Sequence, residues 1–366
     1  MINGERVNLY VFGAGASKHV GAPLTKDFLW EGFSLLPFPD AYDVSTQKSK
    51  IVAKLVDTLC GSGLETCVQD ALDHHVWRPS EIPSVNIEDL LSFVDLAVRR
   101  GETWLPFEDL QDALHEFIFT TLEQTTSLYY SDHYRGRKDG ELDHNRNYYD
   151  KLVDYIIPVD EINCLITFNY DLFLDQVLSI NNHALLGDYN IEFADVENFP
   201  QYERLLFKQR RDGDVDLLKL HGSLNWAWCL RCQRLLLAYY RRYRRIPDQS
   251  CPTCRNSQLL PVLVPPTLLK QLDIQELVTV WHRAEYFLER ADTLTIIGYS
   301  FPDADIEAKW LFKRSIAKNP GQPVLTLIEP DSSVCKKVID FLGHFFQEDP
   351  IFFDTFEEYC EKQIIS

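Results

Sequence analysis

The fold of this chain is decided near its start by the stretch Val7-Asn8-Leu9-Tyr10-Val11-Phe12-Gly13-Ala14-Gly15-Ala16-Ser17. Its first six residues are rich in β-branched and aromatic side chains, which favour a buried strand. Two glycines follow the strand. They allow a tight turn and let the backbone approach a pyrophosphate closely, and a helix is expected beyond them. Such a unit holds phosphate groups at the N-terminus of the helix. We therefore predict that a dinucleotide binds to Gly13, Ala14, Gly15 and Ser17.

This glycine motif is incomplete. A full dinucleotide fingerprint has a third glycine at position 18, where this chain has Lys18, and an acidic residue about 20 residues further on, where none stands convincingly. A glycine turn without a ligand is therefore the alternative. Ser17 is expected to donate to a phosphate, to cap the following helix, or to do both.

Four later apolar runs also end in glycine or polar residues. Near-continuous hydrophobic strands separated by long segments indicate a parallel sheet with helices on both faces. Ligands bind at the carboxyl ends of such strands, and a turn alone has no need of Asn, Asp and His together, so we predict one site there. The four runs and their endings are Cys164–Phe168 with Asn169-Tyr170-Asp171, Leu217–Leu220 with His221-Gly222-Ser223, Leu294–Ile297 with Gly298-Tyr299-Ser300, and Val324–Ile328 with Glu329-Pro330.

The expected fold class is α/β, a Rossmann-like parallel sheet with a large helical insertion and a small zinc ribbon. One domain of this kind fits residues 1–366. About 150 residues with helical periodicity separate the first two strands, which is too long for one crossover, and we assign residues 36–160 to the insertion. Within it, residues 129–147 are polar and aromatic with two glycines and are expected to form a loop.

Four of the nine cysteines form a metal-binding pattern. Cys229-x-x-Cys232 and Cys251-x-x-Cys254 are separated by eighteen residues, the spacing of a four-cysteine zinc ribbon, which we assign to residues 226–260. Four thiolates close the coordination shell, so the Zn²⁺ is expected to be structural. The ribbon also carries an island of arginines and tyrosines, which suits nucleic acid, an acidic protein partner or a solvated face. It comprises Arg231, Arg234, Arg241, Arg242, Arg244, Arg245, Tyr239, Tyr240 and Tyr243.

Charge and hydropathy exclude some classes of function. The formal net charge of −19 argues against wholesale binding of nucleic acid, because a duplex would be repelled, and any such contact must be local. No stretch approaches the ~18 consecutive apolar residues of a membrane-spanning helix, and the N-terminus lacks the features of a signal peptide. We therefore expect a cytoplasmic protein without membrane contact. An odd number of cysteines also argues against a disulfide framework.

Taken together and in order, the motifs resemble those of the sirtuin superfamily. The resemblance covers residues 5–35, 163–175, 216–260 and 290–332, and leaves the helical insertion uncovered. It implies that the chain binds NAD⁺ and cleaves the bond between nicotinamide and ribose, with Asn169 and His221 as the catalytic pair. The motifs are Gly13-Ala14-Gly15-Ala16-Ser17, Gly21-Ala22-Pro23, Asp27-Phe28, Thr167-Phe168-Asn169-Tyr170-Asp171, Leu220-His221-Gly222-Ser223, the two cysteine pairs and Gly298-Tyr299-Ser300.

The departures from the sirtuin pattern point away from deacylation. Sirtuin deacylases carry glutamine where this chain has Phe168 and arginine where it has Leu29, and their peptide-binding loop is not evident after Ser300. The variant pattern looks like the divergent prokaryotic sirtuin-like proteins of antiviral defence. That resemblance implies an NAD⁺ hydrolase that yields nicotinamide and ADP-ribose and depletes NAD⁺ in anti-phage defence. It also implies a homo-oligomer and a HerA-type ATPase or Argonaute-like partner. An NAD-dependent protein deacylase and a non-catalytic nucleotide-sensing subunit are the alternatives.

The chemistry of this cleavage gives the residues their expected roles. Positive, oxocarbenium-like charge develops on the ribose, so a polar group and a base are needed beside it. By resemblance, Asn169 orients a water or the ribose hydroxyls and His221 removes a proton. Asp171 either bonds to the nicotinamide carboxamide or caps the following helix.

The remaining cofactor residues follow the last two strands. Gly298, Ser300 and Glu329 are expected beside the adenosine half of NAD⁺, where Glu329 would accept hydrogen bonds from the ribose hydroxyls. Lys219 lies two residues before His221, and a lysine at the end of a strand is expected to be a solvated charge.

Overall fold

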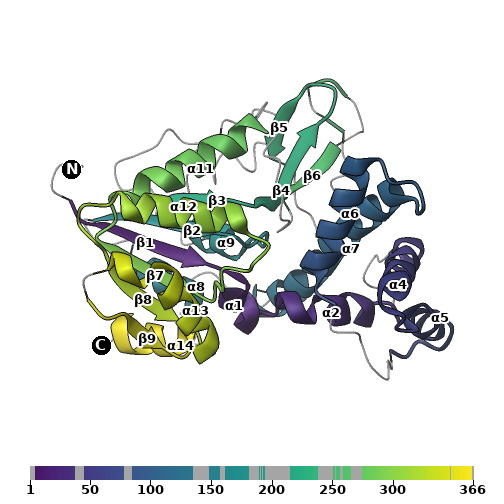
Figure 1. Ribbon diagram of the computed structural model, residues 1–366, viewed down its shortest axis with the longest axis horizontal. Coiled ribbons are helices and arrows are strands. Elements are labelled where there is room, and N and C mark those ends of the chain that lie inside the picture. The colour runs from purple at the N-terminus through teal and green to yellow at the C-terminus, as the bar shows by residue number, and fades with distance from the viewer. Residues whose placement is uncertain are drawn as a thin grey trace.

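The centre of the fold is a six-stranded sheet in which every strand is parallel to its neighbours (Figure 1). The strand order is β3-β2-β1-β7-β8-β9, so the direction of winding reverses between β1 and β7, as in a dinucleotide-binding Rossmann sheet. The predicted fold class is thereby confirmed. The strands are β1 Val7–Phe12, β2 Ile162–Thr167, β3 Asp216–Lys219, β7 Thr293–Ile297, β8 Val324–Ile328 and β9 Ile351–Phe353.

The computed structural model describes most of the chain. The described residues are 5–37, 45–77, 85–134, 148–156, 161–180, 189, 191, 193, 215–237, 250–251, 253–255, 259–264, 274–346 and 348–364.

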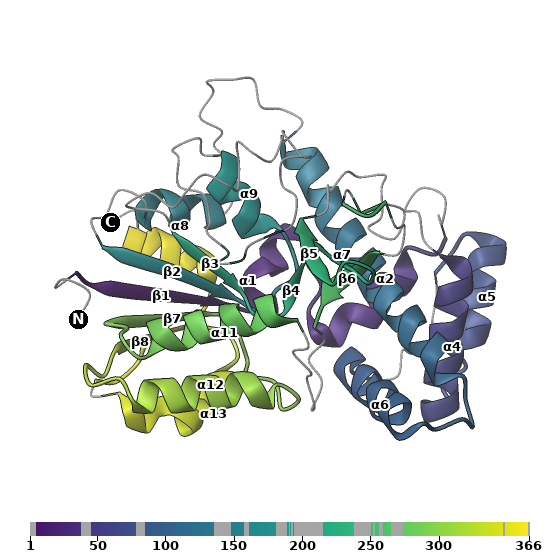
Figure 2. The ribbon, with the colours of Figure 1, turned by 90° about the horizontal axis from the view of Figure 1, so that it is seen from above.

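Helices cover both faces of the sheet, which explains why its strands are apolar on both sides. Tyr10 and Phe12 point to one face and pack with α8, α9 and α14, while Leu9 and Val11 point to the other and pack with α11, α12 and α13. Figure 2 shows the two helical layers on opposite sides of the strands. The helices are α8 Tyr148–Ile156, α9 Phe173–Ile180, α11 Gln275–Leu288, α12 Ile306–Ala317, α13 Ser332–Leu342 and α14 Phe356–Tyr359.

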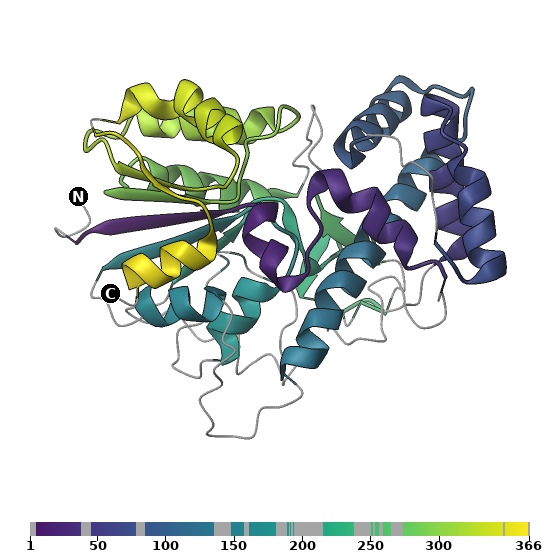
Figure 3. The same cartoon turned by 90° about the horizontal axis from the view of Figure 1, so that it is seen from below.

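Most of the helices between β1 and β2 lie to one side of the sheet (Figure 3). The long helix α7 packs against α2, α4 and α6, whereas α8 packs against the sheet. The division of the chain at residues 36 and 160 stays a prediction. The helices are α1 Ala14–Ser17, α2 Phe28–Ser34, α4 Thr46–Cys60, α5 Leu64–His74, α6 Ile87–Arg100 and α7 Phe107–Tyr134.

The predicted loop at residues 129–147 is wrong in its first part, because α7 continues to Tyr134. No glycine or proline occurs between residues 129 and 134, so nothing there interrupts a helix; Gly136 is the first such residue. Residues 135–147 lie outside the described residues.

A small antiparallel sheet of order β5-β4-β6 joins the large sheet to the helices. Its strand β4 begins after β3 with only two residues between them. Gly222 makes the turn with φ +85°, and a Cβ there would lie 2.0 Å from the Val262 carbonyl oxygen. Leu224 and Leu236 of this sheet share one core with helices α2 and α4–α7. The strands are β4 Gly222–Cys229, β5 Arg234–Leu237 and β6 Leu259–Leu263.

Among the described residues, none of the helices has the length and apolar character needed to cross a membrane.

Candidate functional site

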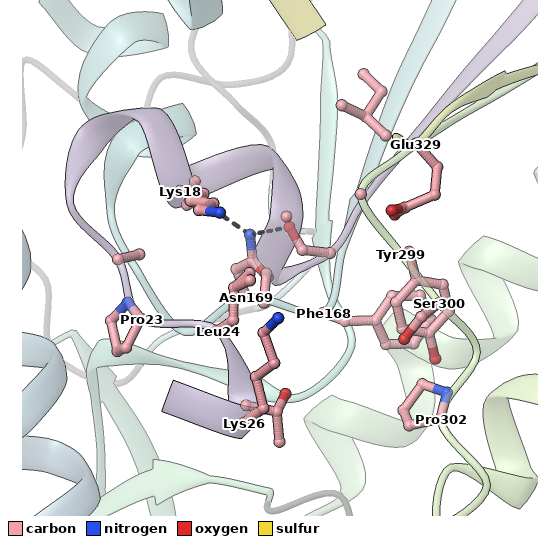
Figure 4. Close-up of a pocket in the computed structure, with 18 of the residues that line it drawn as sticks. Lys18, Pro23, Leu24, Lys26, Phe168, Asn169, Tyr299, Ser300, Pro302 and Glu329 are labelled. Atoms are coloured by element: carbon pink, nitrogen blue, oxygen red, sulfur yellow. Dashed lines mark hydrogen bonds between the residues drawn. The ribbon is translucent and has the colours of Figure 1, made fainter. Parts of the chain in front are cut away.

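A cavity of about 890 Å³ opens at the carboxyl ends of β1, β2, β7 and β8. This is the crevice in which Rossmann-type sheets bind ligands, and the volume lies in the range of small-molecule sites. Helices α6 and α7 contribute the facing wall through Glu88, Leu91 and Ile118. Every residue predicted to bind or cleave the dinucleotide lines this cavity: Gly13, Ala14, Gly15, Ser17, Asn169, Asp171, His221, Gly298, Ser300 and Glu329. Asn169, Ser300 and Glu329 are labelled in Figure 4.

The glycines lie where the loops after β1 and β7 cross. The N–H groups of Gly13 and Gly15 donate to the carbonyl oxygens of Ile297 and Gly298, each at 3.0 Å. A Cβ on Gly13 would lie 2.5 Å from the Gly298 oxygen, so the two main chains touch only because side chains are absent. The helix that follows is a single turn, α1, and its dipole is correspondingly small. The glycines therefore have a packing role whether or not a phosphate binds.

Asn169 is fixed from behind by the loop after β1. Its side-chain nitrogen Nδ2 donates to the carbonyl oxygen of Gly13 at 2.9 Å and to Ser17 Oγ at 3.0 Å. Figure 4 shows these bonds beside the cavity. Because both amide hydrogens are used within the protein, the side chain offers Oδ1 as its acceptor for a ligand hydroxyl.

Ser17 is completely buried and does not cap the turn that follows it, so that part of the prediction is wrong. Its hydroxyl donates to Asp171 Oδ2 at 2.7 Å and lies 2.7 Å from the hydroxyl of Tyr149 on α8. The hydroxyl points toward the loop after β2 because the loops after neighbouring parallel strands meet there. Binding of a phosphate by Ser17 stays a prediction.

Asp171 is engaged through both carboxylate oxygens. Oδ2 accepts a hydrogen bond from the Ser17 hydroxyl. Oδ1 accepts one, at 3.2 Å, from the N–H of Phe173, which is the first residue of α9. The helix cap, one of its two expected roles, is thus present. Burial raises the pKa of Asp171, and the nearby Lys219 opposes this shift.

Lys219 is not a solvated charge. Its side chain is 0% exposed, and Nζ donates to Asp175 Oδ2 at 2.8 Å and to the carbonyl oxygen of Asp171 at 2.5 Å. The expectation failed because β3 is covered by α9, whose Asp175 is the counter-ion. The signal in the sequence was this aspartate in the first turn of the helix that precedes β3. Lys219 thereby supports the backbone of the loop that carries Asn169.

We expect Lys219→Met to lower the free energy of unfolding by about 3–5 kcal/mol, because it leaves the buried carboxylate of Asp175 uncompensated. The double variant Lys219→Met/Asp175→Leu should lose much less, since it removes both charges. Urea denaturation measures both. Equal losses in the single and double variants would show that the ion pair is not the cause.

His221 follows β3 and is 4% exposed. Its Nε2 lies 3.2 Å from Asp305 Oδ2, and the same oxygen accepts from the Tyr299 hydroxyl at 2.7 Å. The ring of Phe168 meets the imidazole edge-on, with centroids 5.0 Å apart, and stacks on Tyr299 at 4.0 Å. Sequence reasoning placed His221 at the site but gave Asp305 no role. The signal in the sequence was Asp305 itself, an aspartate that follows Ser300 closely and directly precedes helix α12.

Sequence reasoning also gave no site role to six other charged residues that line the cavity, Lys18, Lys26, Glu88, Asp331, Asp354 and Glu357. Lys18 and Lys26 line one side and are exposed, while Glu329 stands across the cavity (Figure 4). Burial raises the pKa of Glu329 and lowers that of His19, another lining residue, to about 4. Glu88 on α6 is 6% exposed and comes from the helical segment, where no motif marked it. The sequence did mark Lys18, because it occupies the position of the third glycine in a full dinucleotide fingerprint.

The four ribbon cysteines come together as a cluster compatible with a zinc ribbon. Their sulfur atoms lie within 4.8 Å of one another, with Cys229 to Cys254 at 3.6 Å and Cys232 to Cys251 at 3.8 Å. Tetrahedral zinc with Zn–S bonds of about 2.3 Å requires sulfur atoms about 3.8 Å apart. The donor set therefore fits Zn²⁺.

The two cysteine pairs have the same local form. Each pair is followed by a residue with positive φ, which is Gln233 at 51° after the first pair and Arg255 at 59° after the second. The N–H of this residue donates to the carbonyl oxygen of the first cysteine of its pair. Hydrogen bonding with Cys254 and burial raise the pKa of Cys232 to about 12. Of the arginines and tyrosines in the ribbon, Arg231 and Arg234 are exposed, and residues 239–245 lie outside the described residues.

The family model described as "SIR2-like domain" matches residues 163–342. No curated protein matches the chain.

Several solved structures of Sir2 proteins are similar over most of their length. A Sir2 enzyme is 12% identical, with a TM-score of 0.43, 99% of this chain and 92% of that chain covered. A Sir2 complex with p53 peptide and NAD⁺ is 13% identical, with a TM-score of 0.42 and coverage of 99% and 93%. A Sir2 homologue bound to ADP-ribose is 15% identical, with a TM-score of 0.38 and coverage of 94% and 93%.

The matched segment holds Asn169, His221, the four clustered cysteines, Gly298, Ser300 and Glu329. Residues 163–342 are thus similar to the SIR2-like domain.

Proposed function

We propose that this chain hydrolyses NAD⁺ to nicotinamide and ADP-ribose. One observation carries the proposal: the polar residues that follow five separate strands line a single cavity of about 890 Å³, with Asn169 and His221 among them. The SIR2-like match over residues 163–342 supports NAD⁺ as the dinucleotide.

The charges around the cavity suggest how the dinucleotide lies. Its pyrophosphate would meet Lys18 and Lys26, and its adenosine ribose would meet Glu329 on the opposite side (Figure 4). The nicotinamide ring carries a positive charge, so it would lie at the end where the buried carboxylates of Glu88 and Asp305 line the wall. This places the nicotinamide ribose beside Asn169 and His221.

In this arrangement the side chains perform the two tasks that hydrolysis requires. Oδ1 of Asn169 orients a ribose hydroxyl or the attacking water, because Nδ2 is held by Gly13 and Ser17. The bond from C1′ to the pyridinium nitrogen breaks, and its electron pair leaves with neutral nicotinamide. Water adds to C1′ while His221 takes its proton and later releases it to solvent. The nearby carboxylates favour the cationic transition state.

Asn169→Ala is expected to lower nicotinamide release from NAD⁺ by about 10²–10³, since a positioned polar contact in the transition state is lost. The measurement is chromatography of nicotinamide and ADP-ribose made by the purified chain, with and without an acetylated peptide. Asn319→Ala is a matched control. Asn319 is a buried asparagine outside the cavity, and its Nδ2, like that of Asn169, donates two hydrogen bonds within the protein, here both to main-chain oxygens.

The products decide between hydrolysis and the alternatives. Release without peptide supports the hydrolase. Release that requires peptide and yields acetyl-ADP-ribose would replace it by a protein deacylase, and NAD⁺ binding without turnover would indicate a nucleotide-sensing subunit. For the proposed anti-phage role, cellular NAD⁺ should fall after phage infection with the wild-type chain and not with Asn169→Ala. The oligomeric state and protein partners stay predictions.

A further inference from the structure

Asp305 is a buried carboxylate behind His221 that the proposed reaction does not yet use. It lies directly before α12, is 0% exposed, and receives the N–H of Ala308 at 3.4 Å on Oδ1. Its Oδ2 faces Nε2 of His221 at 3.2 Å and the hydroxyl of Tyr299 at 2.7 Å. A fully buried carboxylate is costly unless its oxygens meet donors, and here both do.

We propose that Asp305 is a positioning residue that holds His221 in the tautomer with its proton on Nε2, so that Nδ1 is the atom that accepts the proton of the attacking water. This inference rests on the proposed hydrolysis for its catalytic meaning. The tautomer itself is a property of the chain and is measurable without substrate.

The tautomer follows from the donors and acceptors at Asp305. An ionised carboxylate only accepts hydrogen bonds, so the imidazole nitrogen facing it must carry the hydrogen. The Tyr299 hydroxyl donates to the same oxygen, so this oxygen already acts as a hydrogen-bond acceptor. In neutral imidazole, the hydrogen on Nε2 leaves the lone pair on Nδ1.

The surrounding rings keep the imidazole in place. Phe168 contacts it edge-on and is itself stacked on Tyr299. The indole N–H of Trp281 donates to the carbonyl oxygen of Leu220 at 2.9 Å and fixes the backbone just before His221. Rotation of the His221 side chain would thus break its contacts with Phe168 and Asp305.

Among the described residues, the titratable side chains around His221 carry no positive charge. Asp305 Oδ2 lies 3.2 Å from its Nε2, the ring of Tyr170 is 6.3 Å away, and Tyr299 and Glu88 line the same cavity. Lys219 is bonded to Asp175 and to the Asp171 carbonyl. The imidazolium that forms would therefore face negative rather than positive side chains.

The direct test is the tautomer of His221 in the ligand-free chain, by long-range ¹H–¹⁵N NMR of the imidazole rings. The signal is assigned by its loss in His221→Gln. We expect the Nε2–H tautomer in the wild type and a change of tautomer in Asp305→Asn. The Nδ1–H tautomer in the wild type would overturn the inference, even if NAD⁺ is hydrolysed.

Kinetics provide the second readout. Asp305→Asn should lower kcat by about 10²–10⁴, as when an orienting carboxylate is lost in a histidine-dependent hydrolase, with little change in the Kd of ADP-ribose. Because the carboxylate of Asp305 faces the imidazole, its loss should move the acid limb of the kcat/KM profile to lower pH. Asparagine caps a helix as well as aspartate does, so α12 should be retained.

Asp303→Asn is the matched control, since Asp303 is 86% exposed and pairs with Lys309 and Lys337. It should leave the tautomer, kcat and pH profile unchanged. An unaltered pH profile and kcat in Asp305→Asn would overturn the positioning role. A wild type with the Nε2–H tautomer but no nicotinamide release would instead overturn the proposed function alone.

Discussion

His221→Ala is expected to lower kcat for nicotinamide release by about 10²–10⁴, because the base that accepts the proton of water is removed. The Kd of ADP-ribose should change little, since Lys18, Lys26 and Glu329 stay in place. Stopped assays of nicotinamide and calorimetry with ADP-ribose measure the two quantities. Free imidazole should restore part of the activity, because the truncated side chain leaves a space open to the cavity.

His282→Ala is the matched control for this prediction. His282 is exposed on α11, one residue after the indole that fixes Leu220, and does not line the cavity. Its activity should equal that of the wild type. Full activity in His221→Ala would remove the imidazole from the mechanism, and loss of ADP-ribose binding would show that the variant has lost the site rather than the base.

Cys251→Ser should release most of the bound zinc and unfold the small sheet. A structural zinc contributes up to about 10–16 kcal/mol of apparent binding energy in isolated fingers, so loss of one thiolate is expected to exceed the effect of any single contact. Cys229 and Cys251 belong to the same core as α2 and α4–α7, so the helical wall of the cavity should loosen too. Metal analysis, thermal unfolding and hydrogen exchange of β4 and β6 measure these effects.

Cys360→Ser is the control for the zinc prediction. Cys360 is 0% exposed and packs on the sheet side, outside the cluster of four. It should keep a full equivalent of zinc and lose only a packing contribution. A wild type purified without zinc, or a Cys251→Ser protein that retains a full equivalent, would contradict the structural zinc.

The sequence determined the features that depend on short stretches of chain. Residues 7–17 indicated a strand and a glycine turn because β-branched side chains and glycines restrict or free the backbone locally. Each cysteine pair folds into the same turn, and its spacing alone indicated zinc. Asn169 and His221 could be placed together because parallel strands end at one edge of their sheet, so the endings of such strands meet whatever lies between them.

Only the tertiary structure decided which partners the polar side chains have. Lys219 is buried because α9 covers β3 and brings Asp175 to it. Ser17 points toward Asp171 and Asn169 instead of capping the helical turn that follows it. Asp305 and Glu88 reach the cavity from helices whose positions relative to β3 no local pattern specifies. Backbone conformation is set largely by neighbours in the chain, whereas the pairing of buried charges is set by which distant elements pack together. The sequence therefore determined where the site lies, and tertiary packing determined how its charges are held.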